Sequence, residues 1–165
     1  MSAHHPLGAS GSSRWLVCPG SVRLSEGIPD QQSPYAQEGT DAHLLAEVCL
    51  QNGLDTHQVS DELGTRKGAT WPEEMREHVQ SFLDYVRLLV PLDAIGLTFS
   101  EVQIDLSPWI PGCFGTVDFA VLDADHKLLH VVDLKYGQGR RVSALNNSQL
   151  LMYALGILAG LEHLF

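Results

Sequence analysis

Two aspartates and a lysine in the second half of the chain have the types and the spacing that metal-dependent phosphodiester chemistry needs. Asp118 ends the motif G-T-V-D, and Asp133 and Lys135 belong to a later D-L-K. Two close carboxylates repel each other, and burying them without a counter-charge is costly. Mg²⁺ or Mn²⁺ would relieve that cost, because both prefer oxygen ligands, water and phosphate. The lysine could position or deprotonate the attacking water, or stabilise charge on the phosphorane.

Alternating apolar residues predict that these motifs lie on neighbouring antiparallel strands, residues 114–122 and 128–135, joined by a polar turn. A turn centred between residues 124 and 125 would set Asp118 opposite Val131. Asp118 and Asp133 would then be diagonal neighbours on one face, roughly 7–8 Å apart at Cα. The lysine two residues beyond Asp133 points to the same face. The alternative is that both aspartates are ordinary strand-end residues and the lysine is an exposed cation paired with one of them.

A histidine on a helix predicted from Thr40 to Leu50 could add an imidazole ligand. His43 precedes Glu47 by one helical turn, so their side chains share a helix face. Glu38, just before this helix, could assist them or simply favour the helix N-terminus. The alternative for His43 is a partly buried polar residue on an amphipathic helix.

Polar and basic groups follow the lysine along the chain. Gln149 and Tyr153 are i, i+4 partners on the last predicted helix, where they could orient Lys135 or hydrogen-bond a phosphate or a base. Arg140 and Arg141 lie in the loop after Lys135 and could contact phosphates. Ordinary helix-surface residues and a solvated basic turn are the respective alternatives.

The remaining periodicity predicts the elements that position these residues. A short helix is expected near Ser12, and a longer helix should start at Pro72 and end at Pro91. A strand should cover residues 98–106, and the last helix should cover residues 145–158. The apolar stripe of the helix after Pro72 comprises Met75, Val79, Phe82, Leu83, Val86 and Leu89. The order of three helices, three strands and a helix predicts an α+β fold with helices packed on a sheet.

Composition narrows the class of protein. A chain of 165 residues with 44% hydrophobic residues fits one globular domain, with residues 1–13 flexible at the start. The net charge of −10 argues against a protein that coats nucleic acid, but a nuclease remains open because bound cations reverse the local sign. The cysteines form no C-x-x-C, and the longest apolar stretch, 150–161, is too short to span a bilayer. Free thiols in a reducing, cytosolic compartment are therefore expected.

Together these motifs resemble the RecB-like exonuclease branch of the PD-(D/E)XK nuclease superfamily. The motifs are the histidine helix, G-T-V-D, V-V-D-L-K-Y-G and Q-L-L-M-Y, in that order. The opening S-S-R-W-L-V-C-P-G-S and the later E-G-T-D-A-H resemble a phage and prophage subgroup of that branch. The resemblance covers nearly the whole chain. It implies one nuclease-like domain over residues 1–165, with a restriction-endonuclease-like core of α/β type and a central mixed sheet that contains an antiparallel hairpin.

The resemblance also implies a role for each motif residue. His43, Asp118 and Asp133, together with the carbonyl of Leu134, would bind Mg²⁺ or Mn²⁺. Lys135 would be the catalytic lysine, acting with Asp118 and Asp133.

Further positions are implied less directly. Gln149 and Tyr153 would match the family motif Q-x-x-x-Y, which supports the lysine and contacts DNA, and Glu101 would match an acidic position that varies in the family. Some relatives hold an iron–sulfur cluster with one cysteine before the core and three after it. Cys18 could match the first, but no cysteine follows Cys113, so no cluster is expected.

The predicted function is a metal-dependent deoxyribonuclease, an exonuclease in phage or prophage DNA recombination or processing in the cytoplasm of the bacterial host. DNA is the expected partner, together with a phage recombination or annealing protein. No association with a membrane is expected. The chain could also form homo-oligomers. Related cores continue with a strand after the glutamine/tyrosine helix, so a truncated form ending at Phe165 is expected. The alternatives are a non-catalytic nucleic-acid-binding or assembly module that keeps the fold, and a metal-binding regulatory protein.

Overall fold

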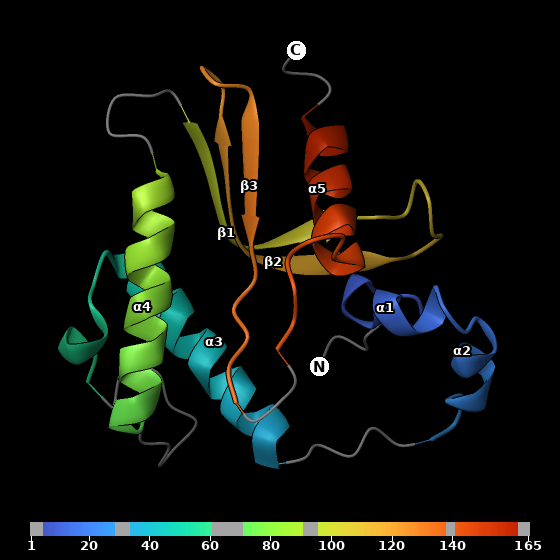
Figure 1. The fold of residues 1–165 in the computed structure, drawn as a ribbon, viewed down its shortest axis with the longest axis horizontal. Coiled ribbons are helices and arrows are strands. Elements are labelled where there is room, and N and C mark those ends of the chain that lie inside the picture. Colours follow the sequence, from blue (N-terminus) through green and yellow to red (C-terminus); the bar gives the residue numbers. More distant parts are fainter. Residues whose placement is uncertain (1–4, 29–33, 61–70, 91–95, 138–140, 162–165) are drawn as a thin grey trace. The chain divides into compact units, whose positions relative to one another are not determined.

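The computed structural model describes residues 5–28, 34–60, 71–90, 96–137 and 141–161. Figure 1 shows its helices and strands. Its contacts divide the chain into two compact units. The terminal unit comprises residues 1–30, 102–117 and 142–165, and the central unit comprises residues 31–101 and 118–141.

Helices and strands alternate between the two units along the chain. The terminal unit contains η1 (Ala9–Gly11), α1 (Ser12–Trp15), α2 (Gly20–Leu24) and α5 (Ser148–Gly160). The central unit contains α3 (Pro34–Asn52), η2 (Thr56–Gln58), α4 (Glu73–Leu89) and β3 (Leu128–Val132). The strands β1 (Gly96–Asp105) and β2 (Phe114–Asp123) contribute residues to both units.

The predicted α+β class is confirmed. In the described part of the chain the three strands form one antiparallel sheet in the order β1-β2-β3, in place of the mixed sheet that was expected.

Helix α3 starts earlier than its sequence suggested. It begins at Pro34, a residue favoured in the first helical turn, and Thr40 is not its N-cap. The Thr40 hydroxyl instead donates a hydrogen bond of 3.0 Å to a carbonyl one turn earlier. At the other end Gly53 adopts φ 65°, and the Leu54 amide donates to the Cys49 carbonyl at 2.9 Å. This 6→1 bond closes the helix as in a Schellman motif.

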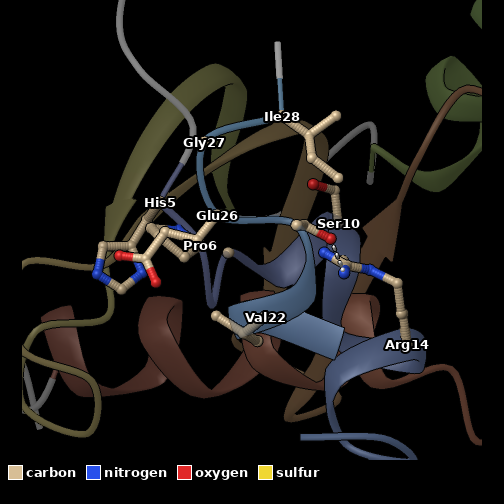
Figure 2. A pocket seen from close by; sticks show the side chains of 11 residues that line it. His5, Pro6, Ser10, Arg14, Val22, Glu26, Gly27 and Ile28 are labelled. Atoms are coloured by element: carbon tan, nitrogen blue, oxygen red, sulfur yellow. Dashed lines mark hydrogen bonds between the residues drawn. The ribbon is translucent and has the colours of Figure 1, made fainter. Parts of the chain in front are cut away.

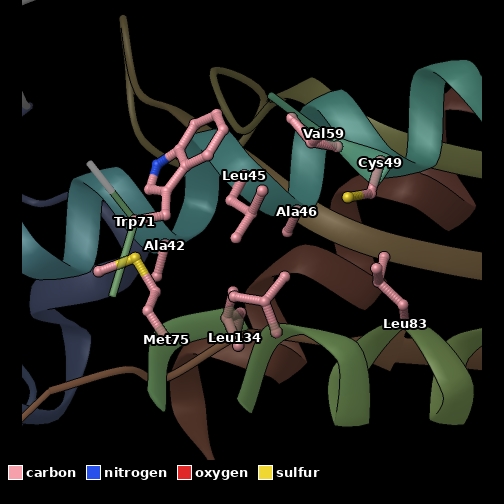
Figure 3. Packing of buried hydrophobic residues seen from close by; sticks show 10 residues of the cluster. Ala42, Leu45, Ala46, Cys49, Val59, Trp71, Met75, Leu83 and Leu134 are labelled. Atoms are coloured by element: carbon pink, nitrogen blue, oxygen red, sulfur yellow. The ribbon is translucent and has the colours of Figure 1, made fainter. Parts of the chain in front are cut away.

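Helix α4 confirms the predicted apolar stripe and packs against α3 (Figure 3). It follows Pro72 directly, and Glu73 and Glu74 face the positive end of the helix dipole. The buried cluster between the two helices contains Ala42, Leu45, Ala46 and Cys49 of α3, Met75, Val79 and Leu83 of α4, and Val59, Trp71 and Leu134. Burial of side chains such as these, each worth about 1.5–3 kcal/mol, holds the helix that carries His43 in place.

The β2–β3 hairpin has a register two residues away from the predicted one. Phe119 pairs with Val132, and continuing by one step sets Asp118 opposite Asp133 instead of Val131. The strand β3 also ends at Val132, so Asp133 and Lys135 follow the last paired residue.

Turn chemistry explains this shift. The turn occupies residues 124–127, where Lys127 adopts φ 55°. The Asp123 carboxylate accepts the His126 amide at 3.1 Å and lies 2.7 Å from the His126 ring. These bonds hold a four-residue turn centred one residue later than expected. Because the shift is an even number of residues, every side chain keeps its predicted face.

The N-terminal residues of the terminal unit pack on α5. Ala9 and Ser12 are buried, and the Ser12 hydroxyl lies 2.6 Å from the Ser148 hydroxyl. Asn147 caps α5 by accepting the amides of residues 149 and 150, so the helix starts three residues after the predicted Leu145. Residues 5–13, in the segment expected to be flexible, therefore include buried contacts.

Gly156 of α5 should be intolerant of a side chain. A Cβ at this position would clash with Ile104 Cγ2 and lie 3.1 Å from Leu106 Cδ2. The Ile104 methyl is attached to a branched carbon and has little freedom to move. Gly156→Ala should therefore lower the free energy of unfolding by about 1–3 kcal/mol, measured by urea titration.

Gly160 provides the matched control for this prediction. It lies in the same helix, and a Cβ there would meet nothing within 4 Å. Gly160→Ala should be neutral or raise the free energy of unfolding by up to about 1 kcal/mol. Equal stability of the two variants would contradict the close packing of α5 on β1.

Candidate metal centre

A histidine–aspartate pair forms the base of the site, in the central unit. His43, near the middle of α3, points its Nδ1 at Asp118 Oδ1 of β2, 3.3 Å away. Only 10% of the Asp118 side chain is exposed, against 33% of the His43 side chain. The structure thus brings together two of the residues expected to share a metal.

The second oxygen of Asp118 is held by the backbone. The Leu134 amide donates a buried hydrogen bond of 2.6 Å to Asp118 Oδ2. The Leu134 side chain lies in the apolar cluster under α3 and α4. This anchor fixes the orientation of the carboxylate and ties β2 to the segment after β3. The predicted role of the Leu134 carbonyl as a metal ligand stays a prediction.

Glu101 of β1 is the third member. Its carboxylate, His43 and Asp118 each offer one ligand atom, and these atoms lie within 4.8 Å of one another. Glu101 has φ 50°, an uncommon value for a residue other than glycine and one that costs of order 1–3 kcal/mol. The left-handed conformation interrupts the alternation of β1. Period-two reasoning alone therefore gave no reason to place Glu101 in the site.

The charges of this cluster perturb one another. Burial, together with the nearby charge of Asp118, raises the pKa of Glu101 to about 7, although His43 acts in the opposite direction. Burial alone would lower the pKa of His43, but the hydrogen bond to Asp118 and the charges of Asp118, Glu101 and Asp133 together raise it. The metal-free site therefore retains protons near neutral pH.

Asp133 and Lys135 form an ion pair beside the cluster. Lys135 Nζ lies 2.5 Å from Asp133 Oδ2, and the side chains are 50% and 9% exposed. Burial raises the pKa of Asp133 and the negative charge of Asp118 adds to this, which outweighs the opposing effect of Lys135. The predicted grouping of Asp118, Asp133 and Lys135 is consistent with these interactions.

The donor set fits a divalent cation. One imidazole and two carboxylates are ligands that Mn²⁺ accepts readily, and Mg²⁺ prefers the oxygens among them. Crowded carboxylates that keep a proton at neutral pH gain most from a bound cation. Glu47, the residue that we paired with His43, accepts a hydrogen bond of 3.0 Å from Gln51 and contributes negative charge near Glu101.

The other predicted residues belong to the terminal unit, are exposed, or lie outside the described part of the chain. Gln149 and Tyr153 belong to α5 in the terminal unit, where Gln149 Nε2 lies 3.2 Å from Tyr153 Oη and the tyrosine ring is buried. Their predicted support of Lys135 stays a prediction. Arg141 is exposed, and Arg140 lies outside the described residues.

A separate pocket of about 720 Å³ occurs in the terminal unit (Figure 2). Arg14 lies at its edge, donating to the Ser21 carbonyl at 3.1 Å and to the Ser25 hydroxyl at 3.0 Å. None of the predicted catalytic or metal-binding residues lines it. Its lining combines backbone, apolar groups and opposite charges, which indicates no single ligand class.

Mn²⁺ affinity should rise with pH between about 6 and 8, because the ion must displace protons from Glu101 and His43. Lowering the pH from 7 to 6 should weaken binding up to about tenfold for each proton displaced. Calorimetric titration in two buffers of different ionisation enthalpy would count these protons.

In Glu101→Gln, Mn²⁺ binding should weaken and its pH dependence should become shallower. The exposed Glu77→Gln serves as the control. An affinity that is independent of pH would contradict the assignment.

Comparisons with known proteins place the chain in a family. Within the described residues, no helix combines the length and apolarity that crossing a bilayer requires. No solved structure matches the chain. Residues 4–165 match the family model described as "Protein of unknown function (DUF2800)". Since this match extends over nearly the whole sequence, the chain belongs to the DUF2800 family.

Proposed function

We propose that this protein is a metal-dependent deoxyribonuclease, acting as an exonuclease in phage or prophage DNA recombination or processing. The proposal includes a restriction-endonuclease-like core, the cytoplasm of a bacterial host as its location, and DNA and a phage recombination or annealing protein as partners. One observation carries it: His43, Glu101 and Asp118 come from three different elements and converge within 4.8 Å, beside the Asp133–Lys135 pair.

The residues divide into two groups by what they can do. His43, Glu101 and Asp118 would hold Mg²⁺ or Mn²⁺, with Asp133 next to them. When bound, the ion supplies charge neutralisation at the scissile phosphate and eases deprotonation of the water nucleophile. Asp118 keeps its orientation through the Leu134 amide, so little reorganisation accompanies substrate binding.

Lys135 acts on the nucleophile and the phosphate. Its ammonium lies beside Asp133 and can donate hydrogen bonds to the attacking water and to a phosphate oxygen. As negative charge grows on that oxygen, the ammonium stabilises it. Of the three roles considered for this lysine, positioning of the water and stabilisation of charge fit the geometry better than proton abstraction.

A non-catalytic nucleic-acid-binding or assembly module is the second candidate. The observation that favours it is the internal pairing of the site, since both Asp118 oxygens and the Lys135 ammonium already have partners in the protein. The net charge of −10 also gives little general attraction for DNA.

Cleavage assays separate the two candidates. Linear and closed circular DNA would be incubated with the protein and Mn²⁺, Mg²⁺ or a chelator, alongside Asp133→Ala. We expect Mn²⁺-dependent digestion of linear DNA by the wild type and none by Asp133→Ala. Resistance of circular DNA would support an exonuclease. A wild-type protein that is folded by circular dichroism, binds DNA and leaves both substrates intact would favour the non-catalytic module.

A further inference from the structure

The segment that carries Asp133 and Lys135 forms part of the wall of another cavity, which lies in the central unit. This cavity, which we call the Tyr136 pocket, has a volume of about 430 Å³ and is lined in part by Glu38, Glu74, His78, Lys135 and Tyr136. Its volume lies within the range of small-molecule and nucleotide sites. His43, Glu101 and Asp118 do not line it.

Lys135 and Leu134 connect the pocket to the candidate metal centre. Lys135 pairs with Asp133 and also lines the pocket. Leu134 donates its amide to Asp118 and lines the same pocket. Asp133 of the ion pair and Tyr136 of the pocket wall are three residues apart, at most about 10 Å of extended chain. The metal centre and the pocket therefore share this segment of the chain.

The aromatic rings of the pocket suit a planar ligand. His78 of α4 and Tyr136 meet edge to face, with ring centroids 5.9 Å apart and an interplanar angle of 66°. This contact holds the Tyr136 ring, which is only partly exposed, at the pocket wall. A held aromatic face is what nucleic-acid-binding proteins use to stack a base, at about 1–3 kcal/mol for each base.

The charged residues that line the pocket favour some planar ligands over others. Glu38 and Glu74 are exposed acids on α3 and α4, and Lys135 is the cation between the pocket and the metal centre. Two carboxylates repel a phosphate but accept hydrogen bonds from amino groups. Among the DNA bases, adenine, cytosine and guanine carry exocyclic amino groups and thymine does not.

We propose that the Tyr136 pocket binds one nucleobase of the DNA strand whose phosphate lies at the candidate metal centre, and that it prefers amino-bearing bases over thymine. The inference rests on the proposed nuclease function for the placement of that phosphate. Tyr136 supplies the stacking surface, His78 fixes the tyrosine ring, and Glu38 and Glu74 accept the amino hydrogens.

Binding of labelled oligo-dC and oligo-dT, measured by fluorescence anisotropy in metal-free buffer, tests this pocket without any cleavage. The two strands carry the same charge, and cytosine has an amino group at C4 where thymine has a carbonyl, besides the 5-methyl group of thymine. We expect oligo-dC to bind about 5–10-fold more tightly than oligo-dT. Tyr136→Leu should weaken both by about 5–20-fold, whereas Tyr136→Phe and the exposed Tyr85→Leu should bind as the wild type does. Glu74→Gln should remove the preference for oligo-dC, and its sequence neighbour Glu73→Gln, outside the pocket, should keep it.

Cleavage in Mn²⁺, measured separately, distinguishes failure of this inference from failure of the proposed function. Equal binding of both strands, together with wild-type binding by folded Tyr136→Leu, would overturn the base pocket even if the protein cuts DNA. A base preference that depends on Tyr136 and Glu74, in a protein that cuts nothing, would support the pocket and remove the nuclease. Absence of both binding and cleavage would overturn both.

Discussion

Lys135→Ala should lower the rate of Mn²⁺-dependent DNA cleavage by about 10²–10⁴-fold, because it removes the cationic side chain that we place beside the attacking water and the phosphate. The Lys135 ammonium lies 2.5 Å from Asp133, so its position is already fixed before substrate arrives. Metal affinity should change far less than the rate, since lysine donates no ligand atom. Single-turnover cleavage of a labelled duplex and Mn²⁺ calorimetry on the same preparation measure the two quantities.

Lys127→Ala is the matched control for this variant. Lys127 lies in the exposed β2–β3 turn and is not part of the site. It removes the same charge from the protein, so any general loss of DNA attraction appears in both variants. A cleavage rate in Lys135→Ala equal to that in Lys127→Ala would show that Lys135 has no catalytic role.

Asp118→Asn and Asp118→Ala should separate metal binding from folding. The asparagine keeps a carbonyl oxygen that can accept the Leu134 amide but loses the negative charge between His43 and Glu101. We expect its Mn²⁺ affinity to fall by about 100-fold or more with a small change in stability. The alanine also leaves the buried Leu134 amide unpaired, which should lower the free energy of unfolding by a further 1–3 kcal/mol or so.

Urea titrations and Mn²⁺ calorimetry on the wild type and both variants would check these values. Wild-type metal affinity in Asp118→Asn would remove Asp118 from the ligand set. Equal stability of the two variants would show that the bond from Leu134 contributes nothing to folding.

Strong, regular periodicity made part of the fold predictable. Helix α4 and strand β2 lie close to their predicted bounds, because many residues contribute to the apolar stripe of α4 and to the apolar run of β2. The start of α3 was missed because Thr40 has the side chain of an N-cap and nothing local reveals that it bonds back into a longer helix. Boundaries depend on single contacts, which a pattern does not contain.

The candidate site was likewise predictable from the sequence only in part. Short motifs indicated His43, Asp118, Asp133 and Lys135, and even the wrong hairpin register preserved the faces, because the error was two residues. The bond from Leu134 to Asp118 was unpredictable, since it depends on where β3 ends and on how the following segment turns. Glu101 could not be placed by alternation, because a left-handed residue breaks the period on which alternation relies.

The backbone conformation of Glu101 also affects the balance between the stability of this protein and its binding of metal. Its φ of 50° would suit glycine, and its carboxylate is half-buried near other acids, so the position is a poor choice for folding alone. Glu101→Gly should therefore raise the melting temperature of the metal-free protein while weakening Mn²⁺ binding. Thermal unfolding with and without Mn²⁺ would detect both effects, and a lower melting temperature in the metal-free variant would contradict them. The same substitution would stabilise the metal-free chain and remove a metal ligand, so stability and metal binding oppose each other at this position.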